Sequence, residues 1–238
     1  MDFPKIGILD VYPNRDSLIY KDLYGIPEAN TIMRGTFRYE GWCEIIDALK
    51  VLKLLSYDKI NLAGLTYDGF MAKQIGEASA TGIRERVAAK LGLKPDARPL
   101  VAMEWLGLFS NEPLNRVEDS PFEIVSDLMI ARMMIQPEER DMVVMQHTFL
   151  ASYPNGKKEV IKSRMLDFGT LKTDTSIART VALPAACGVE MILHGKIQAK
   201  GVHIPVIPAI YNPILTQLET MNIRMVEEYG LALSERIS

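Results

Sequence analysis

The chain has 238 residues, of which 48% are hydrophobic and 24% are charged, and its formal net charge at pH 7 is −3. This composition predicts a globular α/β protein with a sizeable core, and it excludes an overall basic surface. Because lysines and arginines form no cluster along the chain, we expect no nucleic-acid partner and no binding to an anionic membrane surface.

The cysteines and the chain start predict a cytoplasmic protein. Cys43 and Cys187 lie among apolar or small residues, which favours buried thiols over a disulfide. The start, MDFPKIGILD, lacks the basic and apolar segments of a signal peptide. No later apolar run approaches the roughly 18 residues that span a membrane, so we expect no membrane partner.

The first elements are typical of an α/β fold. The order predicted from the pattern is a strand over 5–11, a turn over 12–14, a helix over 16–24, a strand over 31–39 and a helix over 42–52. The last helix rests on apolar residues that recur at three- and four-residue steps. Asn14 and Arg15 therefore fall in a loop between a strand and a helix.

The middle of the chain predicts a helical insert over about 76–139. Gly, Pro, Asn and Asp separate four predicted helices, over 67–75, 82–91, 100–109 and 122–135.

A hairpin and two helices complete the predicted elements. The strands cover 141–153 and 159–168, and Asn155-Gly156 forms the tight turn between them. A helix over 176–193 contains Pro184 and is closed by a glycine, and a helix over 209–221 is opened by a proline at its first turn.

The familiar cofactor, metal and nucleophile motifs are absent from the sequence. No G-x-G-x-x-G follows a strand, and there is no phosphate-binding G-x-x-x-x-G-K-[ST], no G-x-S-x-G and no Cys-x-x-Cys. The histidines His147, His194 and His203 are too scattered for a zinc motif. We expect His147 to be a core histidine and His194 to lie at a helix C-terminus.

An arginine set is the best candidate for chemistry. In the stretch IMRGTFRY, Arg34 and Arg38 share one strand face and flank Gly35 and Thr36. Arg15 precedes a predicted helix, where free N–H groups favour an anion. An arginine fork pairs bidentately with a carboxylate. The alternative is that these arginines form surface ion pairs with neighbouring acids, namely Asp16, Glu28, Glu40 or Glu44.

Four separated blocks resemble one family. YPNRDSLIY, YGIPEANTIMRGTFRYEGWCEIIDALKVL, ERDMVVMQHTFLASYPNGKK and TSIARTVALPAACGVEMILHGKI resemble, in the same order, the catalytic region of glutamate-forming saccharopine dehydrogenases. This region also forms the second half of the bifunctional aminoadipic semialdehyde synthases. The resemblance covers about 6–228. It implies an oxidoreductase of lysine metabolism that transfers a hydride from saccharopine to NAD or NADP, after which water yields glutamate and aminoadipic semialdehyde.

The resemblance also implies site residues. Saccharopine carries three carboxylates, and the matching positions imply that Arg15, Thr36, Phe37 and Arg38 contact it. Arg34 remains open between a substrate contact and a structural ion pair. The helix with Cys187 either lines the domain cleft, as the family implies, or is a kinked core helix.

The sequence departs from the family at its start, because family members begin with a Rossmann-like nucleotide-binding domain. We therefore expect no cofactor-binding residues here, and no metal. The resemblance implies a mixed-sheet domain over 1–175 that binds saccharopine and forms a homodimer. It also implies a segment over 176–238 that packs toward a nucleotide-binding domain, which a second polypeptide could supply.

Three hypotheses for function remain open at this stage. The first is the substrate-binding part of a saccharopine dehydrogenase, without turnover until a nucleotide-binding domain is present. The second is a non-catalytic module that binds an amino acid or dimerises, and the third is an inert remnant. The start is compatible with a truncated chain or a gene divided upstream, and the choice between NAD and NADP stays open.

Overall fold

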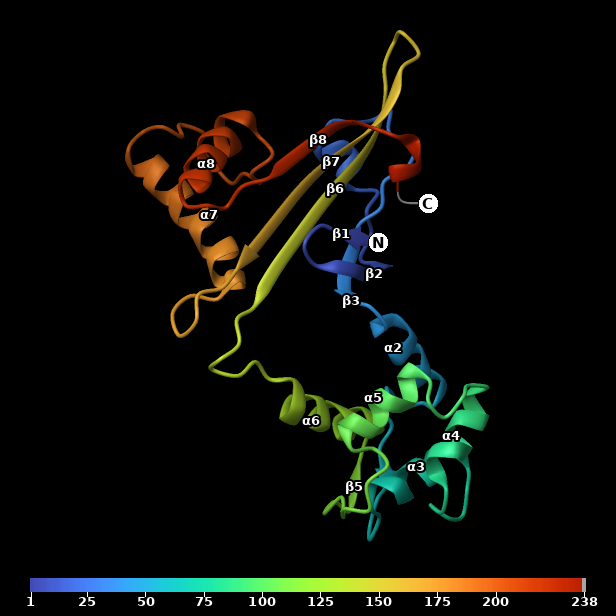
Figure 1. Ribbon diagram of the computed structural model, residues 1–238. Coiled ribbons are helices and arrows are strands. Elements are labelled where there is room, and N and C mark those ends of the chain that lie inside the picture. The colour runs from blue at the N-terminus through green and yellow to red at the C-terminus, as the bar shows by residue number, and fades with distance from the viewer. Residues whose placement is uncertain (237–238) are drawn as a thin grey trace. The chain divides into compact units, whose positions relative to one another are not determined.

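The computed structural model describes residues 1–236 as a mixed α/β fold of helices and short sheets (Figure 1). This confirms the predicted fold class. The chain divides into two compact units: unit 1 contains Met1–Asn14 and Gly35–Met134, and unit 2 contains Arg15–Arg34 and the chain from Ile135 onward. The predicted division into 1–175 and 176–238 concerns the roles of the two parts and stays a prediction.

Three antiparallel strands form the first sheet of unit 1. They are β1 (Asp2–Phe3), β2 (Gly7–Pro13) and β3 (Gly35–Tyr39), in that spatial order. Lys5 and Gly7 have φ angles of 71° and 95°, so the chain turns between β1 and β2. This turn explains why β2 begins later than the strand predicted over 5–11. The register places Tyr12 opposite Thr36.

Five helices build the rest of unit 1 and confirm the helices predicted there. They are α2 (Trp42–Val51), α3 (Tyr67–Ile75), α4 (Ile83–Leu91), α5 (Arg98–Leu106) and α6 (Pro121–Met133), with the small pair β4 (Ile60–Asn61) and β5 (Glu118–Asp119). Helix α5 ends before its predicted bound because Gly107 has a φ of 97°. The core of the unit is apolar and fully buried, with 0% exposure at Leu49, Phe70, Leu100 and Met103.

Unit 2 is built on a long hairpin. Its elements are α1 (Tyr20–Leu23), β6 (Met142–Ser152), β7 (Lys158–Phe168), α7 (Ser176–Leu193), α8 (Pro208–Thr220), β8 (Val226–Leu231) and the 3-10 turn η1 (Leu233–Glu235). Gly156, with a φ of 83°, closes the predicted turn between β6 and β7. The antiparallel order is β6-β7-β8, so the sheet has a third strand that was not predicted. Helix α1 is shorter than predicted because the Asp16 carboxylate accepts from the Leu18 N–H and forms a local turn.

Helices α7 and α8 pack side by side (Figure 1) and share a small core with the hairpin. The buried residues of this core are Met165, Cys187, Leu218 and Ile223. Cys187 is only 2% exposed, which confirms the predicted buried thiol and supports the kinked core helix. Cys43 is half-buried rather than buried, and both thiols are free.

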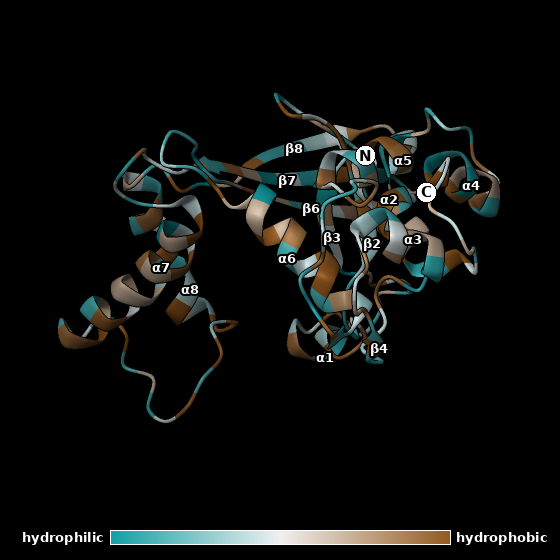
Figure 2. Cartoon of the chain, turned by 90° about the horizontal axis from the view of Figure 1, so that it is seen from below, coloured by the Kyte–Doolittle hydropathy of each residue, from teal (hydrophilic) through white to brown (hydrophobic). Residues whose placement is uncertain are grey.

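Helix α7 corrects the expectation that no segment reaches membrane-spanning length. By length and composition alone its 18 residues could cross a membrane, although only 17% of them are buried. Its apolar residues lie on two sides, one packed against α8 and one exposed, and Figure 2 shows brown hydrophobic stretches along it. Two charged residues, Arg179 and Glu190, interrupt the apolar sequence of α7, and both contact other parts of unit 2.

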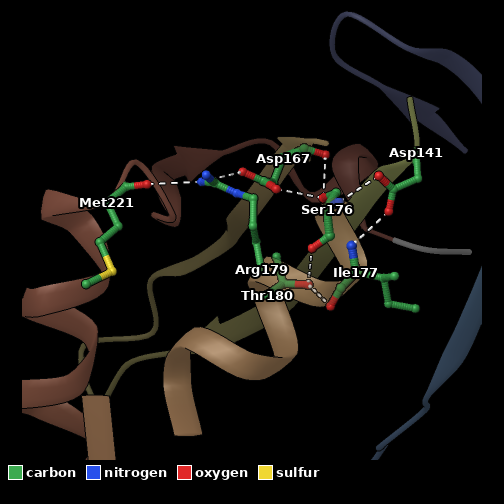
Figure 3. A network of polar contacts seen from close by, with 7 residues as sticks. All are labelled: Asp141, Asp167, Ser176, Ile177, Arg179, Thr180 and Met221. Atoms are coloured by element: carbon green, nitrogen blue, oxygen red, sulfur yellow. Dashed lines mark hydrogen bonds and ion pairs between the residues drawn. The ribbon is translucent and has the colours of Figure 1, made fainter. Parts of the chain in front are cut away.

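A polar network fixes the first turn of α7 to β7 and to the start of β6 (Figure 3). The two carboxylate oxygens of Asp141 accept from the N–H groups of Ser176 and Ile177, at 2.6 and 2.8 Å. Ser176, which is fully buried, donates its hydroxyl to Asp167 Oδ2 at 2.7 Å. Arg179 then joins Asp167 to the backbone carbonyl of Met221, at 3.3 and 3.1 Å. One network therefore holds the hairpin and both helices.

Candidate functional site

The pairing of β2 with β3 places Thr36 beside the end of β2. The amide nitrogen of Asn14 donates to Thr36 Oγ1 at 2.8 Å, and both side chains are half-buried. At Gly35 a Cβ atom would lie 2.8 Å from Val11 Cγ1 and 3.2 Å from the Tyr12 carbonyl oxygen. Glycine is therefore needed at this position because the two strands approach closely, whether or not a ligand also binds there.

Arg38 lies on β3 and forms no ion pair with a carboxylate of the described residues 1–236. Its guanidinium carbon lies 5.8 Å from the Tyr12 ring and 5.9 Å from the Trp42 ring, and Nη1 donates to the Phe37 carbonyl at 2.7 Å. The flanking rings favour the cation by about 0.5 to 1 kcal/mol each at an exposed site. Arg38 itself is exposed, so most of its donors face solvent.

The predicted ion pairs of Arg38 are not formed. Two of the four acids proposed as partners of the arginine set, Glu40 and Glu44, bind another arginine instead, since Arg98 lies 3.4 Å from Glu40 and 2.9 Å from Glu44. Within residues 1–236 no ion pair involves Arg15, Arg34 or Arg38. The surface ion-pair hypothesis is therefore wrong for these arginines.

Phe37 has a packing role in the structure. It is half-buried, and its ring meets the buried Phe3 ring edge-on, with centroids 6.1 Å apart. The side chain therefore anchors β3 to the start of the chain. Its contact with a substrate stays a prediction.

Arg15 and Arg34 belong to unit 2, so the structure describes them separately from Thr36, Phe37 and Arg38. Arg15 is exposed and has a φ of 63°. A side chain other than glycine is uncommon in this left-handed region, and such residues recur at ligand sites. Within residues 1–236 five other non-glycine residues share this feature, so a left-handed backbone alone does not mark a ligand site, and the assignment of Arg15 stays a prediction.

Arg34 holds the segment before β3 in place. Its N–H donates to Ser17 Oγ at 2.9 Å, and its guanidinium donates to the Tyr20 hydroxyl at 2.6 Å and lies 5.4 Å from that ring. Because the Arg34 backbone bonds to Ser17, β3 begins at Gly35 rather than at 31. Arg34 therefore has the structural role that was left open for it, but its partner is the Tyr20 hydroxyl and not an acid.

Asp10 is a positioning residue that the sequence pattern did not indicate. Its Oδ2 atom accepts from the N–H groups of Gly41 and Cys43, at 3.1 and 2.9 Å, and so caps α2 from β2. The hydrogen bond from the Cys43 backbone lowers the pKa of Asp10. Burial and the neighbouring Asp10 carboxylate raise the pKa of the Cys43 thiol, which keeps it protonated and a poor nucleophile.

We expect the Asp10 cap to make unit 1 sensitive to acid. Because folding lowers the pKa of Asp10, its contribution to stability is complete above the unfolded pKa, about 3.9, and is lost as the pH falls through the folded pKa. Asp10→Asn should flatten the stability profile of unit 1 below about pH 5. Hydrogen exchange of α2 between pH 3 and 6 measures this, and an unchanged profile would contradict the assignment.

Unit 1 also contains a depression away from the β2–β3 pair. A shallow depression of about 300 Å³ is lined by Ala63, Gly64, Leu65, Pro113, Asn115, Arg116 and Val117. Its one charged residue, Arg116, is bound by Asp119 and Asp127. Among residues 1–236 no three His, Cys, Asp or Glu side chains come together as metal ligands.

The histidines fall outside any reactive cluster. His147 is exposed on β6, with its ring stacked on Phe149 at a centroid distance of 6.2 Å, so the prediction of a core histidine is wrong. Side chains alternate between the two faces of β6, and the face that carries His147 is exposed. His194 follows the last residue of α7, as predicted, and lies 3.9 Å from Glu190.

Residues 2–223 match the family model of the saccharopine dehydrogenase C-terminal domain. The chain belongs to the saccharopine dehydrogenase family. It is 34% identical over 237 residues to saccharopine dehydrogenase (NADP+, L-glutamate-forming) of Saccharomyces cerevisiae, a match that covers 94% of this chain and 50% of that one. It is also 34% identical over 239 residues to the mitochondrial alpha-aminoadipic semialdehyde synthase of Bos taurus, covering 97% of this chain and 25% of the relative.

A solved structure of the same family has this fold. The apo, histidine-tagged saccharopine dehydrogenase (L-Glu forming) from Saccharomyces cerevisiae superposes with a TM-score of 0.83 at 30% identity. The superposition covers 95% of this chain and 52% of the yeast chain. The 238 residues thus span about half the length of the yeast dehydrogenase and a quarter of the Bos taurus synthase.

Proposed function

We propose that these residues form the substrate-binding, C-terminal part of a saccharopine dehydrogenase. The observation that carries the proposal is that the exposed Arg38 pairs with no acid among residues 1–236, on a chain that matches the family over almost its whole length. A guanidinium has five N–H donors, and here one of them is used on the Phe37 carbonyl. The others are available to a carboxylate.

The proposed ligand fits these donors. Saccharopine has three carboxylates. Unit 1 offers the cation of Arg38 and the hydroxyl of Thr36, and unit 2 separately offers the cation of Arg15. An arginine fork binds a carboxylate through two parallel hydrogen bonds, which fixes the orientation of the ligand as well as its affinity. We assign to these residues the binding and orientation of saccharopine, and to none of them the transfer of hydride.

The oxidant belongs to another part of the enzyme. The yeast relative is named as using NADP, which accepts a hydride when bound. The sequence contains no glycine-rich G-x-G-x-x-G turn, so its residues do not fit a dinucleotide site of that kind. In this proposal a nucleotide-binding domain in the same or a second polypeptide completes the reaction, and the 238 residues alone do not turn over.

Two exposed apolar surfaces of unit 2 support the proposal that the chain binds other parts of the enzyme. On α7 the exposed residues are Ile177, Val181, Val189, Ile192 and Leu193, and on one face of β6 they are Met145 and Phe149. Exposed apolar patches of this kind mark protein interfaces. We propose that the α7 face packs against the nucleotide-binding domain and that the hairpin takes part in a homodimer.

Calorimetric titration of the purified chain with saccharopine tests the proposal. We expect binding that is selective over lysine and glutamate and that weakens with added salt, because charged groups make the contact. Absence of saccharopine binding at millimolar ligand would overturn the assignment of these residues as the substrate-binding part.

A substitution at Arg15 sharpens this test. Arg15→Gly removes the guanidinium and suits the left-handed backbone, whose φ is 63°. We expect a loss of about 2 to 4 kcal/mol in saccharopine binding, with stability unchanged or slightly raised. Arg15→Lys serves as the control, since it keeps the charge and loses the fork. Equal affinity for the wild type and Arg15→Gly would remove Arg15 from the site.

A further inference from the structure

We propose that Asn14 is a positioning residue that fixes the Thr36 hydroxyl as a hydrogen-bond donor to the ligand carboxylate. This inference rests on the proposed function and adds a residue to it. Asn14 directly follows β2, and Thr36 is the second residue of β3. The contact joins residues 22 positions apart, so no sequence motif reveals it.

The hydrogen bond between the two side chains has a direction. Asn14 Nδ2 donates to Thr36 Oγ1 at 2.8 Å. A hydroxyl has one proton to donate and two lone pairs that accept. Because Asn14 occupies a lone pair, the Thr36 proton is not directed at Asn14. Among residues 1–236 this hydroxyl donates to no protein acceptor, so its proton is left for a ligand or water.

The neighbouring cation faces the same way. Residues two apart on a strand share a face, and directly opposite residues of an antiparallel pair do so too. Thr36, Arg38 and Tyr12 therefore lie on one face of the β2–β3 pair. The Tyr12 and Trp42 rings flank the guanidinium of Arg38. A neutral O–H donor and a cation thus share one face of the pair, and Asp10, opposite Arg38 on that face, is bound by the N–H groups of Gly41 and Cys43. A hydroxyl donor with a cation suits a carboxylate better than a cation or an amide.

A purely structural role for Asn14 predicts different behaviour. If the amide only ties the ends of β2 and β3 together, its removal should lower stability and change affinity whether or not Thr36 has a hydroxyl. If Asn14 acts through the hydroxyl, its effect on affinity should vanish once the hydroxyl is gone. A double-mutant cycle separates the two, because it isolates the coupling between the residues.

The cycle measures saccharopine affinity by calorimetry for the wild type, Asn14→Leu, Thr36→Val and the double variant. Leu and Val keep approximately the size of the residues they replace. We expect each single substitution to weaken binding about tenfold, the change typical of one lost hydrogen bond to a charged group. The double variant should bind no more weakly than Thr36→Val. Multiplication of the two losses would overturn the inference.

Two further variants test the direction of the bond. Asn14→Asp replaces a donor with an acceptor, which draws the Thr36 proton away from the ligand, so it should bind at least as weakly as Asn14→Leu. If Asn14→Leu does not fold, Asn14→Asp takes its place in the test. Thr36→Ser keeps the hydroxyl and should stay within about threefold of the wild type.

The outcomes separate this inference from the function on which it rests. Wild-type binding with unchanged affinity in Asn14→Leu and Asn14→Asp would sink only the role of Asn14. Failure of the wild type to bind saccharopine would sink the proposed function and this inference with it. Thermal unfolding of each variant shows whether a loss of affinity follows a loss of stability, which the structural role requires.

Discussion

Arg38→Leu is expected to weaken saccharopine binding by about 2 to 4 kcal/mol, or roughly 30- to 1000-fold, with little loss of folding stability. The loss is large because a charged hydrogen-bonding group that faces the ligand cannot be replaced by water at equal strength. The effect on folding is small because Arg38 is exposed, and its contacts are two rings and one carbonyl.

The control for this prediction is another exposed arginine of unit 1. Arg86 bonds to Glu77 at 3.0 Å on α4, and its side chain is 41% exposed. Arg86→Leu should leave saccharopine affinity unchanged and cost less than about 1 kcal/mol of stability. Arg38→Lys should recover only part of the binding, since lysine keeps the charge without the planar fork. Calorimetry measures the affinity and thermal unfolding measures the stability, and equal affinity of both leucine variants would contradict the assignment of Arg38 to saccharopine binding.

The elements predicted best were those set by local pattern. Helix α2 follows from apolar residues at three- and four-residue steps, and the β6–β7 hairpin from Asn155-Gly156 between two apolar strands. Strand β8 was missed for two reasons. Glu227 and Glu228 interrupt the apolar pattern by which a strand is recognised, and the partner strand β7 lies about sixty residues earlier. Pairing between such distant segments leaves no local trace in composition.

The candidate site shows the same limit. The arginines of IMRGTFRY could be recognised from residue type and spacing, and the family resemblance supplied the ligand. The residues that hold the site could not be found this way, because Asn14 meets Thr36, and Asp10 meets the start of α2, only through the pairing of β2 with β3. A single strand register thus decides which polar groups become partners. The alternative of surface ion pairs failed for a related reason at Glu40 and Glu44, since α5 brings Arg98 to both of these acids.

Asp167→Ala is expected to destabilise unit 2 by about 3 kcal/mol, the largest stability effect we predict for a single polar residue. Asp167 is only 7% exposed, and it accepts from the buried Ser176 hydroxyl and from Arg179. Its removal takes one acceptor from each donor, so that Ser176 keeps only the backbone carbonyl of residue 167 and Arg179 only that of Met221, in a place that water reaches poorly. Because the network in Figure 3 joins β7 to both helices, the loss should spread through α7 and α8.

Hydrogen exchange followed by mass spectrometry should locate this loss. Amides of α7, α8 and β7 should exchange faster in Asp167→Ala, while those of α2 to α6 should keep their protection, since they belong to the other compact unit. The matched control is Asp127→Ala, which removes a carboxylate that is 50% exposed from its pair with Arg116 and should cost less than about 1 kcal/mol. Equal losses in the two variants would show that burial of the Asp167 network contributes nothing beyond a surface pair. Faster exchange in both units would instead mean that they unfold together, so that the α7 network supports β2 and β3 as well as its own helices.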